Sequence, residues 1–568
     1  MDEATNLSPG NAPAVHFENL TFTYKRADGP ALADVNLRIE SGRFVGLIGR
    51  NGAGKSTLAR CVNGIVPKFV KGKLDGRVSV LGRDVARETV ARMTPSVGIV
   101  FQDFETQIFS TGLMREIAFV MENLGRPRDE MREAVERWVD RLDLRDLLGR
   151  EPSTLSGGQK QRLALASILA AEPPILVLDE PTTDLDPISA AELLAALKAL
   201  AHSGRTILFI THELDFLRDA DEIAVLDQGR LVAHGAADAV LGDGPLLERH
   251  GLVAPALSRL AARLRLPRAP RDVDDAEALI RQAGYDGHPE NLADIDARNP
   301  PLGDTVLSVS GVRFGYRPEA PVLEGVDLSV PAGMALAILG QNGSGKTTLM
   351  RNLVGIVEPW DGEIVVDGRD VASMSAAQRA TRIGMVFQNP DHQIFCASAA
   401  EEVAFGVRQV GVAEEAIDER VAEALAFVGL SDEADADPFS MDKGRRKKLA
   451  LASVLACRPK VILLDEPTTG LDVLEQEAMM NLLLSLCASG HAVIFITHHV
   501  ELAMRYAREI RVMHEGRLRA IDNTDFADGE LMAATRLTPP PMAELSRRFG
   551  YPTARFDELL MLLGAEDE

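Results

Sequence analysis

The chain repeats its own sequence, and this duplication constrains its fold more strongly than any other feature. Gly49–Thr57 reads GRNGAGKST, and Gly340–Thr348 reads GQNGSGKTT. VFQDFETQIF in the first half likewise returns as VFQNPDHQIF in the second. Beyond that point one constant offset joins three pairs of residues: Gln102 and Gln388, Asp179 and Asp465, and His212 and His498. Because an ungapped match across separate motifs does not arise by chance, we expect two copies of one fold.

Each copy alternates short apolar segments with longer helical segments. The apolar segments are FVGLIG, ILVLDE and TILFITH in the first half, and ALAILG, VILLDE and AVIFITH in the second. This alternation is typical of a mainly parallel sheet with helical crossovers. Strand-like alternation with glycine-punctuated turns precedes it, around residues 15–40 and 306–330. The predicted fold class is α/β.

A weaker repeat follows each copy and predicts a small helical extension. LVAPALSRLAARL begins at Leu252 and LTPPPMAELSRRF begins at Leu537, and both indicate an amphipathic helix that starts at proline. Residues 265–305 are rich in Pro, Asp and Arg, which favours a linker between two folded units. We therefore predict domains at 14–246 and 305–530, an extension with linker at 247–304, and a C-terminal extension at 531–568.

Charge and hydropathy limit the classes of function. The net charge is −23, which disfavours extensive binding to a nucleic-acid phosphate backbone. No run of 18 or more apolar residues occurs, and the first residues, MDEATNLSPGNAP, are acidic and polar. The expectation from these patterns is a cytoplasmic protein with no nucleic-acid partner.

Both halves contain the motif G-x-x-x-x-G-K-[ST], the phosphate-binding loop. Its glycines let backbone N–H groups surround phosphates at a helix N-terminus, its lysine reaches the β- and γ-phosphates, and its hydroxyl suits Mg²⁺. The candidate ATP-binding residues are Gly49, Asn51, Gly52, Gly54, Lys55, Ser56 and Thr57, and Gly340, Asn342, Gly343, Gly345, Lys346, Thr347 and Thr348. Ser56 and Thr347 are the predicted Mg²⁺ hydroxyls.

An acidic pair ends a buried strand in each half, in ILVLDEPTT and VILLDEPTT. Asp179 and Asp465 suit contact with Mg²⁺, and the following Glu180 and Glu466 suit activation of the attacking water. Such a pair in isolation is more often a helix cap. Its place after a phosphate-binding loop favours the catalytic interpretation.

Two further residue types recur at matching places. His212 and His498 follow the FIT strands and are candidates for hydrogen bonding to the γ-phosphate. Tyr24 and Tyr316 lie upstream of each phosphate-binding loop, where each is a candidate to stack on adenine or, alternatively, a structural tyrosine.

In this order the motifs resemble the nucleotide-binding domains of ABC ATPases, over nearly the whole chain and twice. Leu155–Gln159, LSGGQ, resembles the signature of that family. In that family two domains close head to tail, so each ATP lies between one phosphate-binding loop and the signature of the other domain. The resemblance implies that this chain pairs its own halves, with a glutamine that contacts Mg²⁺ in each site. Site two would combine Lys346, Thr347, Gln388, Asp465, Glu466 and His498 with Ser156, Gly157, Gly158 and Gln159. Site one would combine Lys55, Ser56, Gln102, Asp179, Glu180 and His212 with the second half's signature.

That second signature is chemically altered, in FSMDKGRRKKLALAS. The constant offset places Asp442–Gly444 opposite Ser156–Gly158. Asp442 brings a carboxylate towards the γ-phosphate, and at 4 Å with an effective dielectric near 20 the repulsion is about 4 kcal/mol per charge pair. Lys443 and Arg445 offset part of it. We therefore expect site two to hydrolyse ATP readily, and site one to be slower or mainly to hold nucleotide.

The segments that follow Gln102 and Gln388 narrow the resemblance to one group of ABC ATPases. VFQNPDHQIF with EEVAFG (Glu401 to Gly406), and VFQDFETQIF with EIAF (Glu116 to Phe119), resemble the ATPases of energy-coupling factor (ECF) transporters. This implies a transmembrane coupling protein, a membrane-embedded substrate-binding protein, and a peripheral location at the cytoplasmic face of the membrane. The cargo would be a vitamin or metal ion, with a thiamine precursor as a minor preference.

Three acidic residues are candidates to receive arginines of the coupling protein: Asp103, Glu105 and Asp391. Ordinary solvated surface acids are the alternative for each.

Two other functions share the tandem layout. A fused ATPase of a sugar-type importer is one alternative. A soluble tandem ABC protein that acts on ribosomes is the other, but such proteins are expected to carry a basic helical arm between the domains. Residues 265–305 mix acids, bases and several prolines instead.

Overall fold

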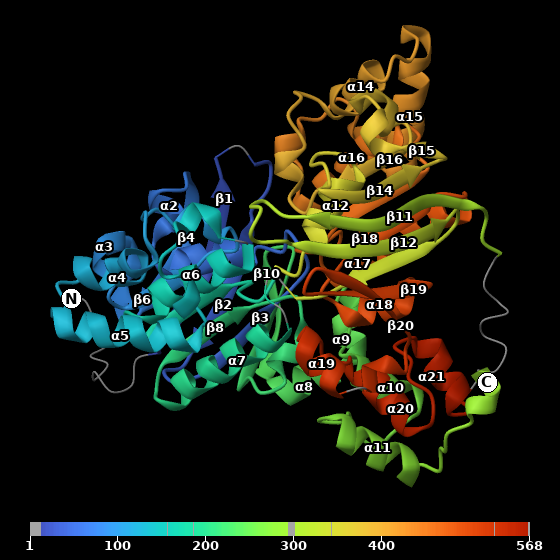
Figure 1. Ribbon diagram of the computed structural model, residues 1–568. Helices are drawn as coiled ribbons and strands as arrows, with labels where there is room; N and C mark the ends of the chain where they lie inside the picture. The colour runs from blue at the N-terminus through green and yellow to red at the C-terminus, as the bar shows by residue number, and fades with distance from the viewer. Residues whose placement is uncertain are drawn as a thin grey trace, which may run out of the picture. The chain divides into compact units, whose positions relative to one another are not determined.

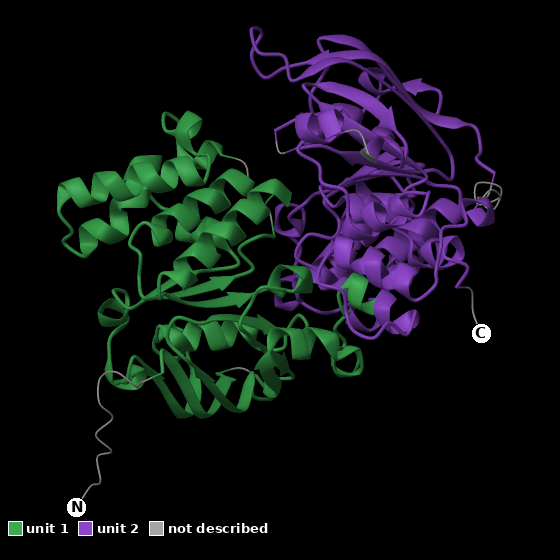
Figure 2. Cartoon of the chain, turned by 90° about the horizontal axis from the view of Figure 1, so that it is seen from below, with its two compact units in different colours: residues 1–259 green, residues 260–568 purple. Residues whose placement is uncertain are grey.

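The computed structural model describes residues 13–25, 27–155, 157–183, 185, 187–292, 301–341, 343–527 and 529–565, with the side chain of Ala527 excepted. The chain divides into two compact units, residues 1–259 and 260–568 (Figure 2). Each unit contains one four-stranded and one six-stranded sheet.

The first unit contains ten strands among its described residues, and its four-stranded sheet has the order β2-β1-β4-β5. The strands are β1 (Val15–Tyr24), β2 (Leu32–Ile39), β3 (Phe44–Ile48), β4 (Gly72–Val80), β5 (Arg83–Asp84), β6 (Val97–Val100), β7 (Ile175–Asp179), β8 (Thr206–Ile210), β9 (Glu222–Asp227) and β10 (Arg230–Ala236). The helices are α1 (Lys55–Val62), α2 (Ile65–Lys68), α3 (Val90–Met93), α4 (Leu113–Asn123), α5 (Arg128–Arg141), α6 (Gly157–Leu169), α7 (Pro187–His202), α8 (Ala237–Gly242) and α9 (Gly244–Arg249). Helix α10 (Ala256–Arg263) spans the boundary between the units.

The second unit repeats this order (Figure 1). Its strands are β11 (Thr305–Phe314), β12 (Leu323–Pro331), β13 (Ala335–Leu339), β14 (Asp361–Val366), β15 (Arg369–Asp370), β16 (Ile383–Val386), β17 (Val461–Asp465), β18 (Ala492–Ile496), β19 (Glu509–His514) and β20 (Arg517–Ile521). Its helices are α11 (Val273–Gln282), α12 (Lys346–Leu353), α13 (Ala376–Ala380), α14 (Ala399–Gln409), α15 (Ile417–Val428), α16 (Lys443–Leu455), α17 (Val473–Ala488), α18 (Val500–Tyr506), α19 (Gly529–Thr535), α20 (Pro541–Arg548) and α21 (Phe556–Leu562).

The six-stranded sheets are parallel except at one edge strand. Their orders are β10-β9-β3-β8-β7-β6 and β16-β17-β18-β13-β19-β20, with β10 and β20 antiparallel to their neighbours. Strands β3, β7 and β8 are buried at every residue, as expected for central parallel strands covered on both faces. The α/β prediction is confirmed.

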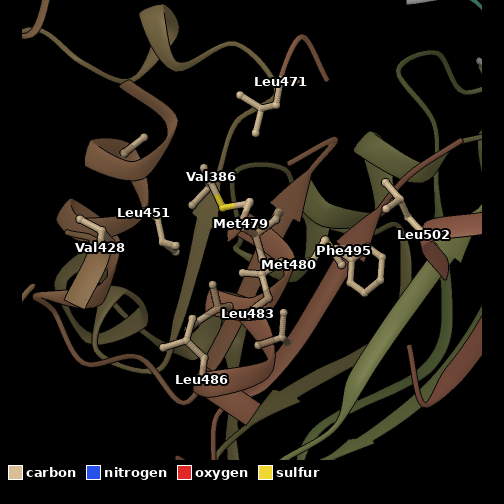
Figure 3. Packing of buried hydrophobic residues seen from close by; sticks show 14 of the residues in the cluster. Val386, Val428, Leu451, Leu471, Met479, Met480, Leu483, Leu486, Phe495 and Leu502 are labelled. Carbon is tan, nitrogen blue, oxygen red and sulfur yellow. The ribbon is translucent and has the colours of Figure 1, made fainter. Parts of the chain in front are cut away.

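Each six-stranded sheet separates two hydrophobic cores. Along β7, Ile175 and Val177 belong to one core while Leu176 and Leu178 belong to the other, because successive side chains of a strand point to opposite faces. In the second unit the larger core lies between the sheet and helices α14 to α17, and Figure 3 shows Met480 of α17 beside Phe495 of β18. Helices α14, α15 and α16 also pack against one another.

The stretch expected to be a linker is in part folded. Residues 293–300 lie outside the described residues, but α11 precedes them and packs against α20 (Figure 1). Arg548 of α20 makes ion pairs of 2.6 Å with Asp274 and 3.0 Å with Glu277 of α11. Arg281 lies over the ring of Phe549, 4.7 Å from its centroid. The linker prediction is therefore wrong for α11, while the predicted domain boundaries stay a prediction.

The close approach of Gly287 to the C-terminal extension gives a test of this packing. A Cβ atom on Gly287 would lie 1.8 Å from the carbonyl oxygen of Phe549, so Gly287→Ala must move the backbone. We expect the packing of α11 against α20 to lose about 1–3 kcal/mol of free energy. Amide hydrogen exchange in α11 should then be about tenfold faster or more.

Gly529→Ala is the matched control, because no atom lies within 4 Å of the Cβ that it adds. Unchanged exchange in α11 of the Gly287→Ala variant would contradict the prediction.

Candidate active sites

The two phosphate-binding loops connect β3 to α1 and β13 to α12. In each, the motif lysine is buried and folded back on the loop. Lys55 Nζ donates hydrogen bonds to the carbonyl oxygens of Gly49 (2.7 Å) and Arg50 (3.0 Å). Lys346 Nζ makes the equivalent bonds to Gly340 and Gln341 at 2.6 and 2.9 Å. The ammonium group is thus held at the centre of each loop.

The last glycine of each loop is required by its backbone. Gly54 has φ of 102° and Gly345 has φ of 108°, a left-handed conformation that side chains rarely adopt. A Cβ on Gly54 would lie 2.5 Å from the carbonyl oxygen of Ala31. With no side chain here, the loop can turn directly into the helix and present its backbone N–H groups.

A cavity of about 280 Å³ in the first unit gathers the predicted residues from four distant segments. Its lining contains the tyrosine, the loop, the glutamine and the acidic pair: Tyr24, Asn51, Gly52, Gly54, Lys55, Ser56, Thr57, Gln102, Asp179 and Glu180. In the second unit Gln388 is exposed. Ser156 and Asn342 lie outside the described residues.

The aspartates that end β7 and β17 are paired with the loop hydroxyls. Thr347 Oγ1 donates to Asp465 Oδ2 at 2.9 Å, and the Ser56 hydroxyl bonds to Asp179 in the same way. Burial raises the pKa of both aspartates to about 6, and the neighbouring glutamate adds to the effect. A buried carboxylate beside a hydroxyl is an all-oxygen donor set, which fits Mg²⁺.

Each catalytic glutamate candidate forms a buried pair with its histidine. Nδ1 of His212 lies 2.8 Å from Glu180 Oε2, and Nδ1 of His498 lies 2.9 Å from Glu466 Oε1. Burial alone would lower the pKa of His212, but the Glu180 carboxylate outweighs it and raises that pKa to about 9. Burial likewise favours a higher pKa for Glu180 and Glu466, yet their histidines hold both pKa values below the ordinary value.

The pairing with His498 uses only one carboxylate oxygen of Glu466. Glu466 Oε2 is buried and has no hydrogen-bond partner among the described residues. A buried carboxylate oxygen without a partner is costly, so its place at the strand end indicates a ligand such as a water molecule.

The signature helices brace the backbone of these glutamates, which the sequence alone did not reveal. Glu180 and Glu466 have left-handed φ values of 54° and 49°, a strained conformation for glutamate. Gln161 Nε2 of α6 donates to the Glu180 carbonyl at 3.4 Å, and Lys447 Nζ of α16 donates to the Glu466 carbonyl at 2.8 Å. Each signature helix therefore supports the catalytic glutamate of its own half.

The altered signature forms the N-terminus of α16 and carries charged side chains there. Asp442 is the N-cap of α16 and accepts a 2.8 Å hydrogen bond from the Arg445 amide. Arg445 Nε lies 3.3 Å from the same carboxylate. Lys443 extends to Gly470 of its own half, where an added Cβ would lie 2.6 Å from the ammonium. In the first half α6 begins at Gly157, so Gly157, Gly158 and Gln159 form its first turn.

The two tyrosines lie next to the phosphate-binding helices. The hydroxyl oxygens of Tyr24 and Thr57 are 2.7 Å apart, and those of Tyr316 and Thr348 are 3.4 Å apart. Tyr316 is 57% exposed, so its ring is available to a ligand. Adenine stacking by the two tyrosines stays a prediction.

Two further residues in each half hold the segment that follows the glutamine. Buried Glu402 accepts 2.9 Å hydrogen bonds from the amides of Phe395 and Cys396, and buried Glu116 likewise accepts bonds from Phe109 and Ser110. Gln107 and Gln393 accept bonds from the amides of Phe101 and Phe387. These glutamates and glutamines are equally spaced in the two halves of the sequence, and that repeat was the signal that could have identified them.

Two of the three acids expected to receive a partner's arginines are already paired. Glu105 lies 2.8 Å from Lys160 Nζ, and Asp391 lies 3.0 Å from Arg446 Nη1. For Asp103 no ion pair is seen among the described residues, and its side chain is exposed. The prediction that it receives an arginine of the coupling protein stays a prediction.

Comparison with known proteins decides the family. Residues 32–183 and 323–469 each match the ABC transporter family. The chain belongs to this family. It is an ATP-binding protein with two ABC domains in tandem, and its enzyme class is ATPase.

Similar proteins extend over nearly the full length. A protein of Caldanaerobacter subterraneus subsp. tengcongensis is 39% identical over 96% of this ABC protein and 97% of its own length. One of Methanosarcina acetivorans is 38% identical over 95% and 91%. Both are named "Putative ABC transporter ATP-binding protein". A solved structure, cbiO1 from Clostridium perfringens, part of the ABC transporter complex cbiONQ, is 34% identical, covers 40% of this chain and 94% of its own, and has a TM-score of 0.37.

In the described part of the ABC protein, no helix combines the length and the hydropathy that crossing a membrane requires.

The brace on Glu466 gives a test of its role. Lys447→Met removes the donor to the Glu466 carbonyl, so the strained glutamate can relax away from the attacking water. We expect kcat for ATP hydrolysis to fall about tenfold, as for one lost hydrogen bond, with KM nearly unchanged.

Lys447→Gln is the matched control, because Gln161 occupies this place in the first half. It should keep kcat within about threefold of the wild type. Equal losses in the two variants, measured by steady-state ATP hydrolysis, would contradict the brace.

Proposed function

We propose that this ABC protein is the ATP-hydrolysing subunit of an ECF-type importer, which drives uptake of a vitamin or metal ion through separate membrane subunits. One observation carries the proposal: each half presents an exposed phenylalanine pair on a rigid segment directly after its glutamine loop. The sequence of those segments, which resembles ECF-type ATPases, supports the same assignment.

The aromatic pairs are built alike in the two halves. Phe395 and Phe405 pack edge to face with centroids 4.9 Å apart, and Phe109 and Phe119 do so at 4.3 Å. Phe395 and Phe109 are each 60% exposed. Solvent-exposed aromatic clusters of this kind are typical of interaction sites.

The buried glutamates give these pairs a fixed position. Glu402 holds the Phe395 amide, and Phe405 lies on the same helix, α14, as Glu402. Since the carboxylate is buried, the loop and the helix behave as one rigid unit. A rigid aromatic anchor next to the glutamine loop suits a partner whose movement must follow ATP binding.

We propose that helices of a transmembrane coupling protein bind these pairs, with a membrane-embedded protein to select the substrate. Such binding places the ABC protein at the cytoplasmic face of the membrane as a peripheral subunit. Because Glu105 and Asp391 are paired with Lys160 and Arg446, an arginine from the partner would exchange with these cations and not meet bare carboxylates.

The partner site predicts a binding defect without an enzymatic one. Substituting Phe109, Phe119, Phe395 and Phe405 together by Ser removes the apolar anchors of both halves, so the protein should no longer co-purify with a polytopic membrane protein from detergent-solubilised membranes. Co-purification is measured by mass spectrometry of the eluted complex, relative to the wild type.

Ile356→Ser is the control, since Ile356 is also highly exposed in the second unit. Retention of the polytopic partner by the fourfold variant would refute the aromatic anchors. Co-purification with ribosomes in place of a membrane protein would refute the importer assignment as a whole.

We further propose that the two halves pair within one chain and enclose two ATP molecules. Asp179 with Ser56, and Asp465 with Thr347, are the residues that would hold Mg²⁺, with Gln102 and Gln388. When bound, Mg²⁺ neutralises charge on the phosphates.

Within site two, each residue has a separate task. Lys346 holds the β- and γ-phosphates, and Tyr316 stacks on the base. Glu466 accepts the hydrogen bond of the attacking water through its unpaired Oε2 and orients it. His498 fixes the other carboxylate oxygen through Nδ1 and would donate to the γ-phosphate through Nε2. Ser156 and Gly157 complete this site from the first half.

The two sites should differ in rate. Site one receives Asp442 where site two receives Ser156, and the Asp442 carboxylate opposes the γ-phosphate. Glu466→Gln should therefore remove most ATP turnover, to below about a tenth, whereas Glu180→Gln should leave at least about half. Both are measured as steady-state phosphate release by the purified chain.

The substitutions are isosteric, so each serves as the control for the other. The opposite ranking would refute the assignment of the fast site.

A further inference from the structure

The ABC protein has two tryptophans, and they have opposite environments. Trp138 on α5 is fully buried in the first unit. Trp360, directly before β14, is 41% exposed. Tryptophan is among the most buried residues on average, so a large exposed indole near a ligand site requires a reason.

Trp360 is held in place beside the strand that carries Tyr316. Its amide donates a 2.7 Å hydrogen bond to the Arg313 carbonyl. Its ring centroid is 6.1 Å from that of Phe314, and Phe314 in turn is 5.2 Å from Tyr316. The three rings form one aromatic cluster at the end of β11.

The indole also covers the residue immediately before Tyr316. A Cβ on Gly315 would lie 2.6 Å from Cη2 of Trp360 and 3.0 Å from Cζ2. Glycine at this position makes room for the indole and also for the carbonyl oxygen of Ala320, which would lie 2.5 Å from the same Cβ.

The first half lacks both features of this arrangement. At the constant offset, DGRVSVLGRDV follows Leu74 and DGEIVVDGRDV follows Trp360, so Leu74 occupies the place of Trp360. Thr23 precedes Tyr24 where Gly315 precedes Tyr316. The large ring and the glycine that makes room for it therefore occur together, and only in the second half.

We propose that Trp360 is a second aromatic contact for the base of a purine nucleotide at the second site, alongside Tyr316. This inference rests on the proposed nucleotide-binding role of Tyr316. Tyr316 is bonded to the phosphate-binding helix through Thr348 and through Arg351, whose Nη1 donates to its hydroxyl at 3.2 Å. The ring of Phe314 contacts both Tyr316 and Trp360, so the exposed indole extends the aromatic surface that contains Tyr316.

Stacking accepts any base but is stronger for purines, because their rings overlap more of the indole. The second site therefore holds ATP and GTP more tightly than the first, while pyrimidine nucleotides gain less. Leu74 offers the first site no comparable surface.

Affinity measurements at single sites test the proposal. Lys55→Ala and Lys346→Ala each disable one phosphate-binding loop, so the remaining site can be titrated alone with a non-hydrolysable ATP analogue by calorimetry. Trp360→Leu copies the first half. In the Lys55→Ala background it should weaken binding about tenfold. In the Lys346→Ala background it should leave the Kd unchanged.

Fluorescence gives an independent readout. In a Trp138→Phe variant, Trp360 is the sole tryptophan, and the analogue should change its emission with the Kd of the second site. The change should persist with Lys55→Ala and disappear with Lys346→Ala.

The outcomes separate this inference from the proposed function. If the second site binds the analogue but Trp360→Leu leaves its Kd unchanged, the Trp360 contact is refuted and the site stands. If the Lys55→Ala protein binds no analogue at all, the nucleotide role of the second loop fails, and the Trp360 contact fails with it.

Discussion

Three parallel strands that end at one edge of the sheet bring the candidate catalytic residues of the first unit together. Strand β8 pairs with β3 on one side and with β7 on the other. The lysine follows β3, the acidic pair ends β7, and the histidine follows β8. Because parallel strands present their carboxyl ends together, groups far apart in the chain meet at that edge. The backbone there is strained at the glutamate, so the site depends on the buried strands and the signature helix that hold it.

Much of this was predictable because it follows from side-chain pattern. Apolar runs such as ILVL before Asp179 indicate strands that are buried on both faces, and the glycines Gly54 and Gly345 of the loops are required by their φ values. The braces were not predictable, because Glu402 and Lys447 bond to backbone groups, which are the same at every position of a sequence. Composition misled for α11, where Asp272 caps a helix in a stretch that resembles a linker. Charge alone likewise did not reveal that Glu105 is paired with Lys160.

The two halves keep the catalytic geometry and differ in what surrounds it. Distances in the histidine–glutamate pairs agree to 0.1 Å, at 2.8 and 2.9 Å. The brace, however, is neutral Gln161 in one half and charged Lys447 in the other. Lys447 is 2% exposed, and a buried ammonium is costly unless its bonds compensate. The Glu466 carbonyl therefore accepts a charge-assisted bond of 2.8 Å, whereas the Glu180 carbonyl accepts a longer, neutral bond of 3.4 Å.

The altered signature places a charged group where the proposed pairing of the halves needs a helix N-terminus for the γ-phosphate. Asp442 caps α16 with the kind of hydrogen bond that a serine also makes, and its carboxylate is in addition stabilised by the helix dipole. The same dipole is what an intact signature offers to a γ-phosphate. Asp442 occupies it permanently with a charge of the chain's own, and Arg445 balances that charge locally. In the proposed pairing, a γ-phosphate at this helix would therefore compete with a covalently attached anion, because both charges would occupy the same end of the helix dipole.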